Sequence, residues 1–226
     1  MYKKSSRFAC VLTLMAASAA LASAAAFAPP QNAPLSSSFP GPLWDIVAPN
    51  GGTASAVNAH LLLNVPGGSN HDAFTPANDA IRAVQPIGNV DFDVSIKIDS
   101  ALVATDADTS QGLMVLVDAK NFITFALGTN GKNIALNVHS VTGGVAAKVF
   151  DNATFSEYQN PMYLRISRTG SNYIAYYSVD GNVWTQAVAF RDTRVPTSIG
   201  PFAGNYNPTP AKAVPVVMSI NWFDIL

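Results

Sequence analysis

The sequence of 226 residues is poor in the residue types that most often carry catalysis and metal binding. It has one cysteine, Cys10, one glutamate, Glu157, and three histidines that lack the spacing of a zinc site. A Gly-x-Ser-x-Gly elbow for nucleophilic catalysis is also missing. We therefore expect neither a zinc centre nor a serine or cysteine nucleophile.

The first 24 residues have the pattern of a signal peptide. Lys3, Lys4 and Arg7 precede an apolar run over residues 8–22, and Ala22-Ser23-Ala24 has the small residues that signal peptidase accepts. The apolar run is shorter than the roughly twenty residues that cross a bilayer, and no later run is longer. The sequence predicts a secreted or periplasmic protein whose mature chain has no membrane span, and no cysteine for a disulfide.

Two further regions follow the predicted signal peptide. Residues 25–42 contain five prolines and three serines between positions 29 and 42, which is typical of a linker. Residues 43–226 are long enough to bury a core as one domain without disulfides. Without the first 24 residues, ten basic residues face fourteen acidic ones, a formal charge of −4 that makes nucleic acid a poor partner.

Apolar residues in this domain alternate with polar ones at a period of two, which predicts strands. The clearest case is the segment 90–100, and turn signals recur about every ten residues. Segment 113–117 is apolar without alternation, which suits a strand covered on both faces, and segment 122–127 follows after a tight turn. We expect both to be central strands. Segments 173–179 and 183–190 flank Asp180-Gly181 and predict a hairpin, while the last strand, 214–226, is expected to pair near the first, 43–48. The fold class is an all-β, two-sheet antiparallel β-sandwich.

The order of these segments resembles the concanavalin A-like lectin and glucanase superfamily. It is most similar to the modules that follow the catalytic domain in bacterial β-xylosidase-type glycosidases, and to free-standing relatives. Each motif is weak alone, and the order along the chain carries the resemblance. The motifs are Leu43-Trp44-Asp45, Asn58-Ala59-His60-Leu61-Leu62-Leu63, Asp91-Phe92-Asp93-Val94, Gln111-Gly112-Leu113-Met114-Val115, Asn121-Phe122-Ile123, Tyr163-Leu164-Arg165-Ile166-Ser167-Arg168, Tyr176-Tyr177-Ser178-Val179-Asp180-Gly181 with Trp184, and Ile199-Gly200-Pro201-Phe202-Ala203.

The resemblance implies a jelly roll with one concave face on which family members hold oligosaccharides. Hydrolases of this kind use two carboxylates, usually glutamates, and Glu157 has no second glutamate to act with. We therefore expect a non-catalytic, lectin-like module that binds an oligo- or polysaccharide, and not an enzyme. Two alternatives stay open: a structural or adhesive surface protein, and a glycoside hydrolase that uses aspartates, either Asp91 with Asp93 or Asp106 with Asp108.

The candidate binding residues fall into three groups. A polar segment over residues 67–82 offers imidazole, carboxylate, amide and guanidinium groups for sugar hydroxyls. Two glutamines lie beside strands expected to line the concave face, and two aromatic residues could stack on a pyranose ring. Each group has a structural alternative, namely turn capping, bridging between loops, and sheet packing. The residues are His71, Asp72, Asn78, Asp79, Arg82, Gln85, Gln111, Tyr177 and Trp184.

The segment Asp106-x-Asp108-x-Ser110 resembles the beginning of a calcium loop. An EF-hand is excluded because Gln111 stands where the loop needs glycine and Val117 where it needs the closing glutamate. A different oxygen-rich calcium site stays open, and we expect no other cofactor. The sequence does not identify the sugar, a protein partner or the oligomeric state.

Overall fold

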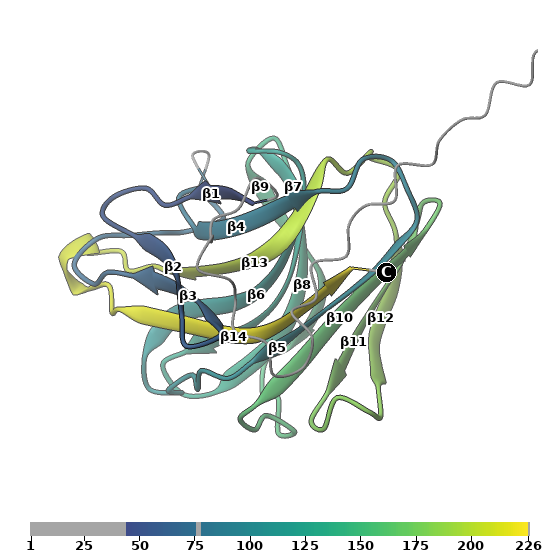
Figure 1. Cartoon of the computed structure of the whole chain (residues 1–226). Coiled ribbons are helices and arrows are strands. Elements are labelled where there is room, and N and C mark those ends of the chain that lie inside the picture. The colour runs from purple at the N-terminus through teal and green to yellow at the C-terminus, as the bar shows by residue number, and fades with distance from the viewer. Residues whose placement is uncertain (1–43, 76–77, 226) are drawn as a thin grey trace, which may run out of the picture.

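The computed structural model describes residues 44–75 and 78–225, in which two seven-stranded antiparallel sheets face one another (Figure 1). Sheet A has the order β1 (Asp45–Val47), β4 (Ile81–Pro86), β13 (Ser198–Asn205), β6 (Ala107–Asp118), β7 (Asn121–Asn130), β8 (Ile134–Thr142) and β9 (Val145–Asn152). Sheet B has the order β12 (Thr185–Arg191), β11 (Asn172–Ser178), β10 (Met162–Thr169), β5 (Phe92–Ile98), β14 (Val216–Ile225), β3 (His60–Val65) and β2 (Thr53–Val57). The predicted all-β sandwich is confirmed.

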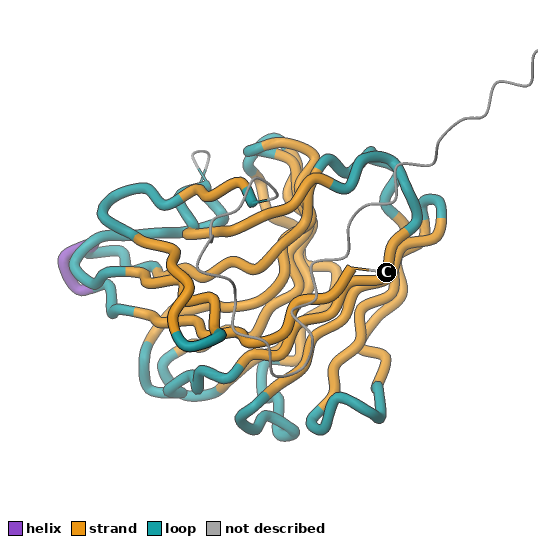
Figure 2. Tube along the Cα trace, in the orientation of Figure 1, coloured by secondary structure: helices purple, strands orange, loops and turns teal. Residues whose placement is uncertain are grey.

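Helix contributes little to the described residues. They contain one 3₁₀ turn, η1 (Pro210–Lys212), between β13 and β14 (Figure 2). None of their helices is long and apolar enough to span a membrane. The predicted signal peptide, residues 1–24, and linker, residues 25–42, lie outside the described residues.

The sandwich core forms where the inner faces of the two sheets meet. In β5, Phe92, Val94 and Ile98 are buried in this core, and the alternate residues Asp93 and Lys97 lie on the outer face of sheet B. Successive side chains of a strand point to opposite sides, so the alternation in the sequence becomes one apolar and one polar face. The strand predicted over residues 90–100 is confirmed on this basis.

Strands β6 and β7 are apolar on both faces because sheet A is covered on both sides. Leu113 and Val115 of β6 face the sandwich core, while Met114 and Leu116 join a second apolar cluster on the outer side of the sheet. β6 lies at the centre of sheet A, with β7 beside it. The prediction that both segments are central is confirmed, as is the coverage of segment 113–117 on both faces.

The ends of the described chain contact one another without pairing. β14 pairs with β3 and β5 in sheet B, whereas β1 pairs with β4 in sheet A. The two segments still meet, because the ring centroids of Trp44 and Phe223 lie 5.1 Å apart. The two strands belong to different sheets and do not pair with each other, but the expectation that they lie near one another is confirmed.

The predicted hairpin is present as β11 and β12, but its loop is longer than two residues. The last register pair is Tyr177 with Thr185, so the chain from Ser178 to Trp184 forms the connection. One oxygen of the Asp180 carboxylate accepts hydrogen bonds from the amides of Asn182 and Val183, at 2.8 and 2.9 Å. The aspartate thus stabilises a wide turn.

Candidate functional site

The connection between β3 and β4 crosses the outer face of sheet A. Its residues Ala73 and Ala80 are buried there against Phe122, Ala126 and Phe202, which point outward from β7 and β13. Apolar side chains on the outer side of the sheet are thus removed from water by the chain itself. The connection therefore covers part of the outer face of sheet A.

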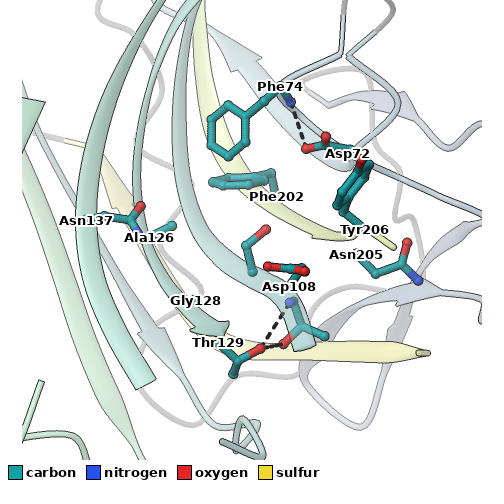
Figure 3. A pocket seen from close by; sticks show the side chains of 12 residues that line it. Asp72, Phe74, Asp108, Ala126, Gly128, Thr129, Asn137, Phe202, Asn205 and Tyr206 are labelled. Atoms are coloured by element: carbon teal, nitrogen blue, oxygen red, sulfur yellow. Dashed lines mark hydrogen bonds between the residues drawn. The ribbon is translucent and has the colours of Figure 1, made fainter. Parts of the chain in front are cut away.

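A pocket of about 190 Å³ lies beside this segment on the outer face of sheet A (Figure 3). The strands of the sheet curve around it, so it occupies the concave side. Five parts of the chain meet here: the β3–β4 connection, β6, β7, β8 and the end of β13. The lining residues are Asp72, Phe74, Asp108, Thr109, Ser110, Ala126, Gly128, Thr129, Asn137, Phe202, Asn205 and Tyr206.

Asp72 contributes a partly buried carboxylate to the pocket. One of its oxygens accepts a hydrogen bond from the amide of Phe74 at 2.9 Å, which fixes the side chain at the rim. Burial raises the pKa of Asp72 above its ordinary value, and the charges of Asp108 and Asp79 raise it further. No cation is paired with this carboxylate among the described residues.

Asp108 brings a second carboxylate to the same pocket. The pairing of β6 with β7 is irregular between Ala107 and Ser110, and Asp108 has a φ of 52°, which aspartate tolerates better than most residues. Such bulges turn a side chain away from the regular pattern of the strand. The amide of Tyr206 donates to the backbone oxygen of Asp108 at 2.9 Å and holds this bend.

Four polar groups in the pocket make no hydrogen bond to the described part of the chain. They are the carboxylate of Asp108, the hydroxyl of Ser110, the amide of Asn137 and the hydroxyl of Tyr206, which come from β6, β8 and the segment after β13. By contrast, Thr129 is engaged, because its oxygen accepts from the amide of Thr109 at 3.0 Å. The pocket therefore offers donors and acceptors for a ligand.

The charge of the pocket restricts what it binds. Its lining contains two carboxylates and no lysine, arginine or histidine. An anion would meet repulsion there, whereas a neutral molecule rich in hydroxyl groups would donate hydrogen bonds to the carboxylates. The rings of Phe74 and Phe202 supply an apolar wall. This combination favours a neutral polyhydroxylated ligand with an apolar face.

The described residues lack the side-chain cluster of a typical zinc site. They contain no group of three or more histidine, cysteine, aspartate or glutamate side chains arranged to hold an ion. Asp72 and Asp108 supply two carboxylates, fewer charged ligands than a dedicated calcium loop brings together. Calcium also takes amide, backbone and water oxygens, so the calcium site left open by the sequence stays a prediction.

The polar segment predicted from the sequence lies around the pocket, but of its five candidate binding residues only Asp72 lines the pocket. His71 is fully buried, and its amide donates to the side-chain oxygen of Asn205 at 2.9 Å, so it supports the rim from behind. Asn78 and Arg82 are buried, and the guanidinium donates to the backbone oxygen of Asn78 at 2.9 Å. Asp79 donates its amide to the backbone of Asp72 at 3.1 Å. These residues shape the connection that carries Asp72.

Gln85 and Gln111 do not face the concave side as predicted. Both follow the alternation of the inward residues of their strands and are buried between the sheets, at 4% and 0% exposed. The side-chain amide of Gln111 donates to the backbone oxygen of Ser100 at 3.0 Å, which bridges β6 to the chain after β5. The expectation that they lie at a binding surface is therefore wrong, because their side chains point to the inner face of sheet A and not to the outer one.

Tyr177 and Trp184 lie on sheet B, away from the pocket. Tyr177 packs inward, with its ring centroid 4.9 Å from that of Phe155. Trp184 lies on the outer side, where the guanidinium of Arg165 stands 5.6 Å from its ring centroid. The aromatic candidates and the polar candidates are thus not brought together.

Several pocket residues were not predicted from the sequence. Phe74, Asn137, Asn205 and Tyr206 come from segments that meet only through the strand order, which local patterns do not reveal. Asp108 was noticed in its acidic segment, and a break in alternation at residues 106–110 was the available signal. The aspartate pair Asp91 and Asp93 is placed elsewhere, since Asp93 pairs with Arg165 on the outer face of sheet B.

Comparison with known proteins identifies the fold but no family. No family model matches the sequence, and no curated protein matches it. The structure is similar to a functionally unknown protein from Saccharomyces cerevisiae, with a TM-score of 0.63 and 14% identity over 81% of this chain and 94% of the other. The match therefore extends over nearly all of the yeast chain and over most of this one.

Two further similar structures belong to carbohydrate-related proteins. One is the GH43 protein BlXynB from Bacillus licheniformis, with a TM-score of 0.57 and 17% identity over 74% of this chain and 32% of that protein. The other is the exoplasmic/lumenal domain of VIP36 in its Ca²⁺/Man3GlcNAc-bound form, with a TM-score of 0.56 and 13% identity over 83% and 86% of the two chains. This chain spans about a third of the glycosidase. The fold is concanavalin A-like, as the sequence resemblance implied.

Proposed function

We propose that this protein is a secreted, non-catalytic carbohydrate-binding module whose site is the concave-face pocket of sheet A. The observation that carries the proposal is the meeting of two carboxylates, a free amide, free hydroxyls and two phenyl rings in one pocket without a cation. Carboxylates and amides bind sugar hydroxyls, and a ring face packs on the apolar face of a pyranose. The similarity of the fold to a lectin and to glycosidase modules supports the same proposal.

The size of the pocket indicates how much of a glycan it holds. Its volume of about 190 Å³ is smaller than the roughly 300–1,000 Å³ of sites that enclose drug-sized ligands. A single sugar residue fits such a volume better than an enclosed oligosaccharide. The protein would thus hold one residue of a glycan and leave the remainder on the surface.

One observation favours the second candidate, a glycoside hydrolase that uses aspartates. Asp72 and Asp108 share the pocket, and the pKa of Asp72 is raised by burial and by the charge of Asp108. A carboxyl with a raised pKa next to an ionised one is the arrangement that an acid and a nucleophile require. The structural or adhesive alternative is less well supported, because such a role does not need a pocket lined with free polar groups.

Titration calorimetry with two carbohydrates tests the binding proposal. Man3GlcNAc is the glycan named with the VIP36 structure. Xylobiose is a fragment of xylan, the polymer named with a further similar structure, a xylan β-1,4-xylosidase from Bacillus halodurans. Asp72→Asn and Asn137→Ala each remove a group that would bind a hydroxyl, so we expect at least a tenfold loss of affinity, about 1.4 kcal/mol. Glu157→Gln is the matched control, because Glu157 is exposed on a loop and does not line the pocket. Equal affinity in all four proteins would contradict the proposal.

The unmodified protein, Asp72→Asn and Glu157→Gln, together with Asp108→Asn, distinguish binding from hydrolysis. We expect no release of reducing sugar above a boiled control. Titrations with calcium and with a chelator test whether the two pocket carboxylates bind calcium. Turnover that disappears in Asp72→Asn and Asp108→Asn but persists in Glu157→Gln would instead establish the hydrolase.

A further inference from the structure

The pocket ends at Phe74, and two buried polar groups lie on the far side of this ring. Phe74 lines the pocket, and its ring centroid is 4.8 Å from that of His139 on β8. His139 is the register partner of Thr124 on β7. Neither Thr124 nor His139 lines the open pocket. Phe74 therefore forms the boundary between the open pocket and this pair.

Thr124 and His139 continue the surface that forms the pocket. The neighbouring register pair, Ala126 with Asn137, lines the pocket, and it lies two residues along the same strands. Side chains two residues apart on a strand share a face and are about 6.8 Å apart. Thr124 and His139 therefore lie on the concave face, about one step beyond the pocket.

Both residues have buried polar atoms without a partner. Thr124 is 0% exposed and its hydroxyl oxygen makes no hydrogen bond, and the Nδ1 atom of His139 is buried and likewise unpaired within the described residues. Burial lowers the pKa of His139, which favours the neutral ring. Buried polar atoms are nearly always hydrogen-bonded, so an unpaired hydroxyl beside an unpaired ring nitrogen requires an explanation.

We infer that Thr124 and His139 form a second sugar subsite, which opens when the Phe74 side chain rotates away from His139. This inference rests on the proposed function of the pocket. The hydroxyl of Thr124 and the Nδ1 atom of His139 then bind hydroxyls of a second sugar, next to the one held by Asp72, Asp108 and Asn137. The ligand is therefore a glycan chain of at least two neutral sugar residues lying across β6, β7 and β8.

The proposal predicts a chain-length preference that depends on Thr124. Titrations with xylose against xylobiose, and with mannose against Man3GlcNAc, give the ratio of affinities for the longer and shorter ligand. In the unmodified protein we expect a ratio of at least ten in one series. Thr124→Val removes the hydroxyl at nearly constant volume and should bring the ratio close to one, with monosaccharide affinity unchanged. Phe74→Ala removes the ring over His139 and should raise the ratio.

Two controls distinguish a subsite from a packing effect. Thr185→Val makes the same change on an exposed residue of β12 in sheet B and should leave the ratio unchanged. The melting temperature of Thr124→Val should equal or exceed that of the unmodified protein, because the substitution removes an unpaired buried hydroxyl. A lower ratio in a stable variant therefore reports binding.

The outcomes separate this inference from the proposed function. If the unmodified protein binds sugars but Thr124→Val keeps the same ratio, the subsite is overturned and the pocket function stands, and an ordered water would then explain the unpaired hydroxyl. If the unmodified protein binds none of the four sugars, the proposed function fails and the subsite fails with it.

Discussion

The outer faces of the two sheets differ in their ion pairs, since sheet B has several and the pocket on sheet A has none among the described residues. On sheet B, Asp93 is paired with Arg165, whose guanidinium also lies 5.3 Å from the ring centroid of Tyr176, and Lys97 is paired with Asp99 at 2.9 Å. On sheet A, Asp72 and Asp108 have no cation, and the hydroxyl of Thr124 is unpaired. Sheet B also has unpaired groups among the described residues, namely Asp224, which has no cation, and the buried side-chain oxygen of Asn221, so sheet A is distinguished by the gathering of such groups in one pocket.

The sandwich and the pocket also differ in what stabilises them. The core between the sheets is formed by strands from both, whereas the outer cluster of sheet A depends on the β3–β4 connection packing against one sheet. The pocket is bounded by that connection. Substitutions on each face test whether the outer cluster of sheet A stabilises the fold and whether sugar binding depends on sheet A or on sheet B.

Phe202→Ala should give the largest effect on stability. Phe202 is 0% exposed, belongs to the outer cluster and lines the pocket, so its truncation removes a buried ring and leaves a cavity. We expect the free energy of unfolding to fall by about 3–5 kcal/mol, similar to the roughly 2–5 kcal/mol expected for Leu164→Ala in the sandwich core. Urea denaturation measures both. A loss below about 1 kcal/mol for Phe202→Ala would mean that the outer cluster does not stabilise the fold.

Arg165→Ala should have a smaller effect and should spare binding. It breaks the ion pair with Asp93 and removes the cation from the rings of Tyr176 and Trp184. Because the guanidinium is partly exposed, we expect a loss of about 1 kcal/mol in the free energy of unfolding. Calorimetry should show unchanged sugar affinity. A loss of affinity would place the binding surface on sheet B and contradict the comparison.

The charge of Asp72 should give the smallest effect, visible in its pH dependence. Its pKa is raised in the folded protein by burial and by Asp108. As pH rises from the unfolded to the folded pKa, the unfolded chain releases its proton first, so this residue lowers stability over that interval. Asp72→Asn should therefore become more stable than the unmodified protein as pH rises, and equal to it at low pH.

Sugar affinity should change in the opposite direction over the same interval. Ionisation of Asp72 provides an acceptor for ligand hydroxyls, so affinity should rise with pH while stability falls. Melting curves and titrations at a series of pH values measure both quantities. A parallel change of the two would contradict the assignment of Asp72 to the site.

Much of the fold follows from local sequence patterns, because alternation and turn residues act over short distances. The strand beginning at Phe92 and the hairpin around Asp180 were predicted because their burial depends on a period of two. The sheet to which the last strand belongs was not predicted, because strand order is decided by contacts between distant segments. Local patterns carry no information about those contacts.

The site was predicted less completely than the fold for the same reason. Asp72 was identified from its polar segment, but Asn137 and Tyr206 join it only through the order of strands in sheet A. Gln111 was misplaced because the local pattern does not show which face of β6 meets the other sheet, and Gln111 shares the inward face of Leu113 and Val115. Trp184 was named as a ring that could stack on a sugar, and in the structure the guanidinium of Arg165 lies against it.

An amide chemical-shift titration of the isotopically labelled protein with xylobiose and Man3GlcNAc tests the central claim most directly. We expect one of the two sugars to shift the resonances of Asp108, Gly128, Asn137 and Tyr206, and to leave those of Tyr176 and Trp184 unchanged. Shifts gathered around Trp184 on sheet B, with none in the concave-face pocket, would contradict the account.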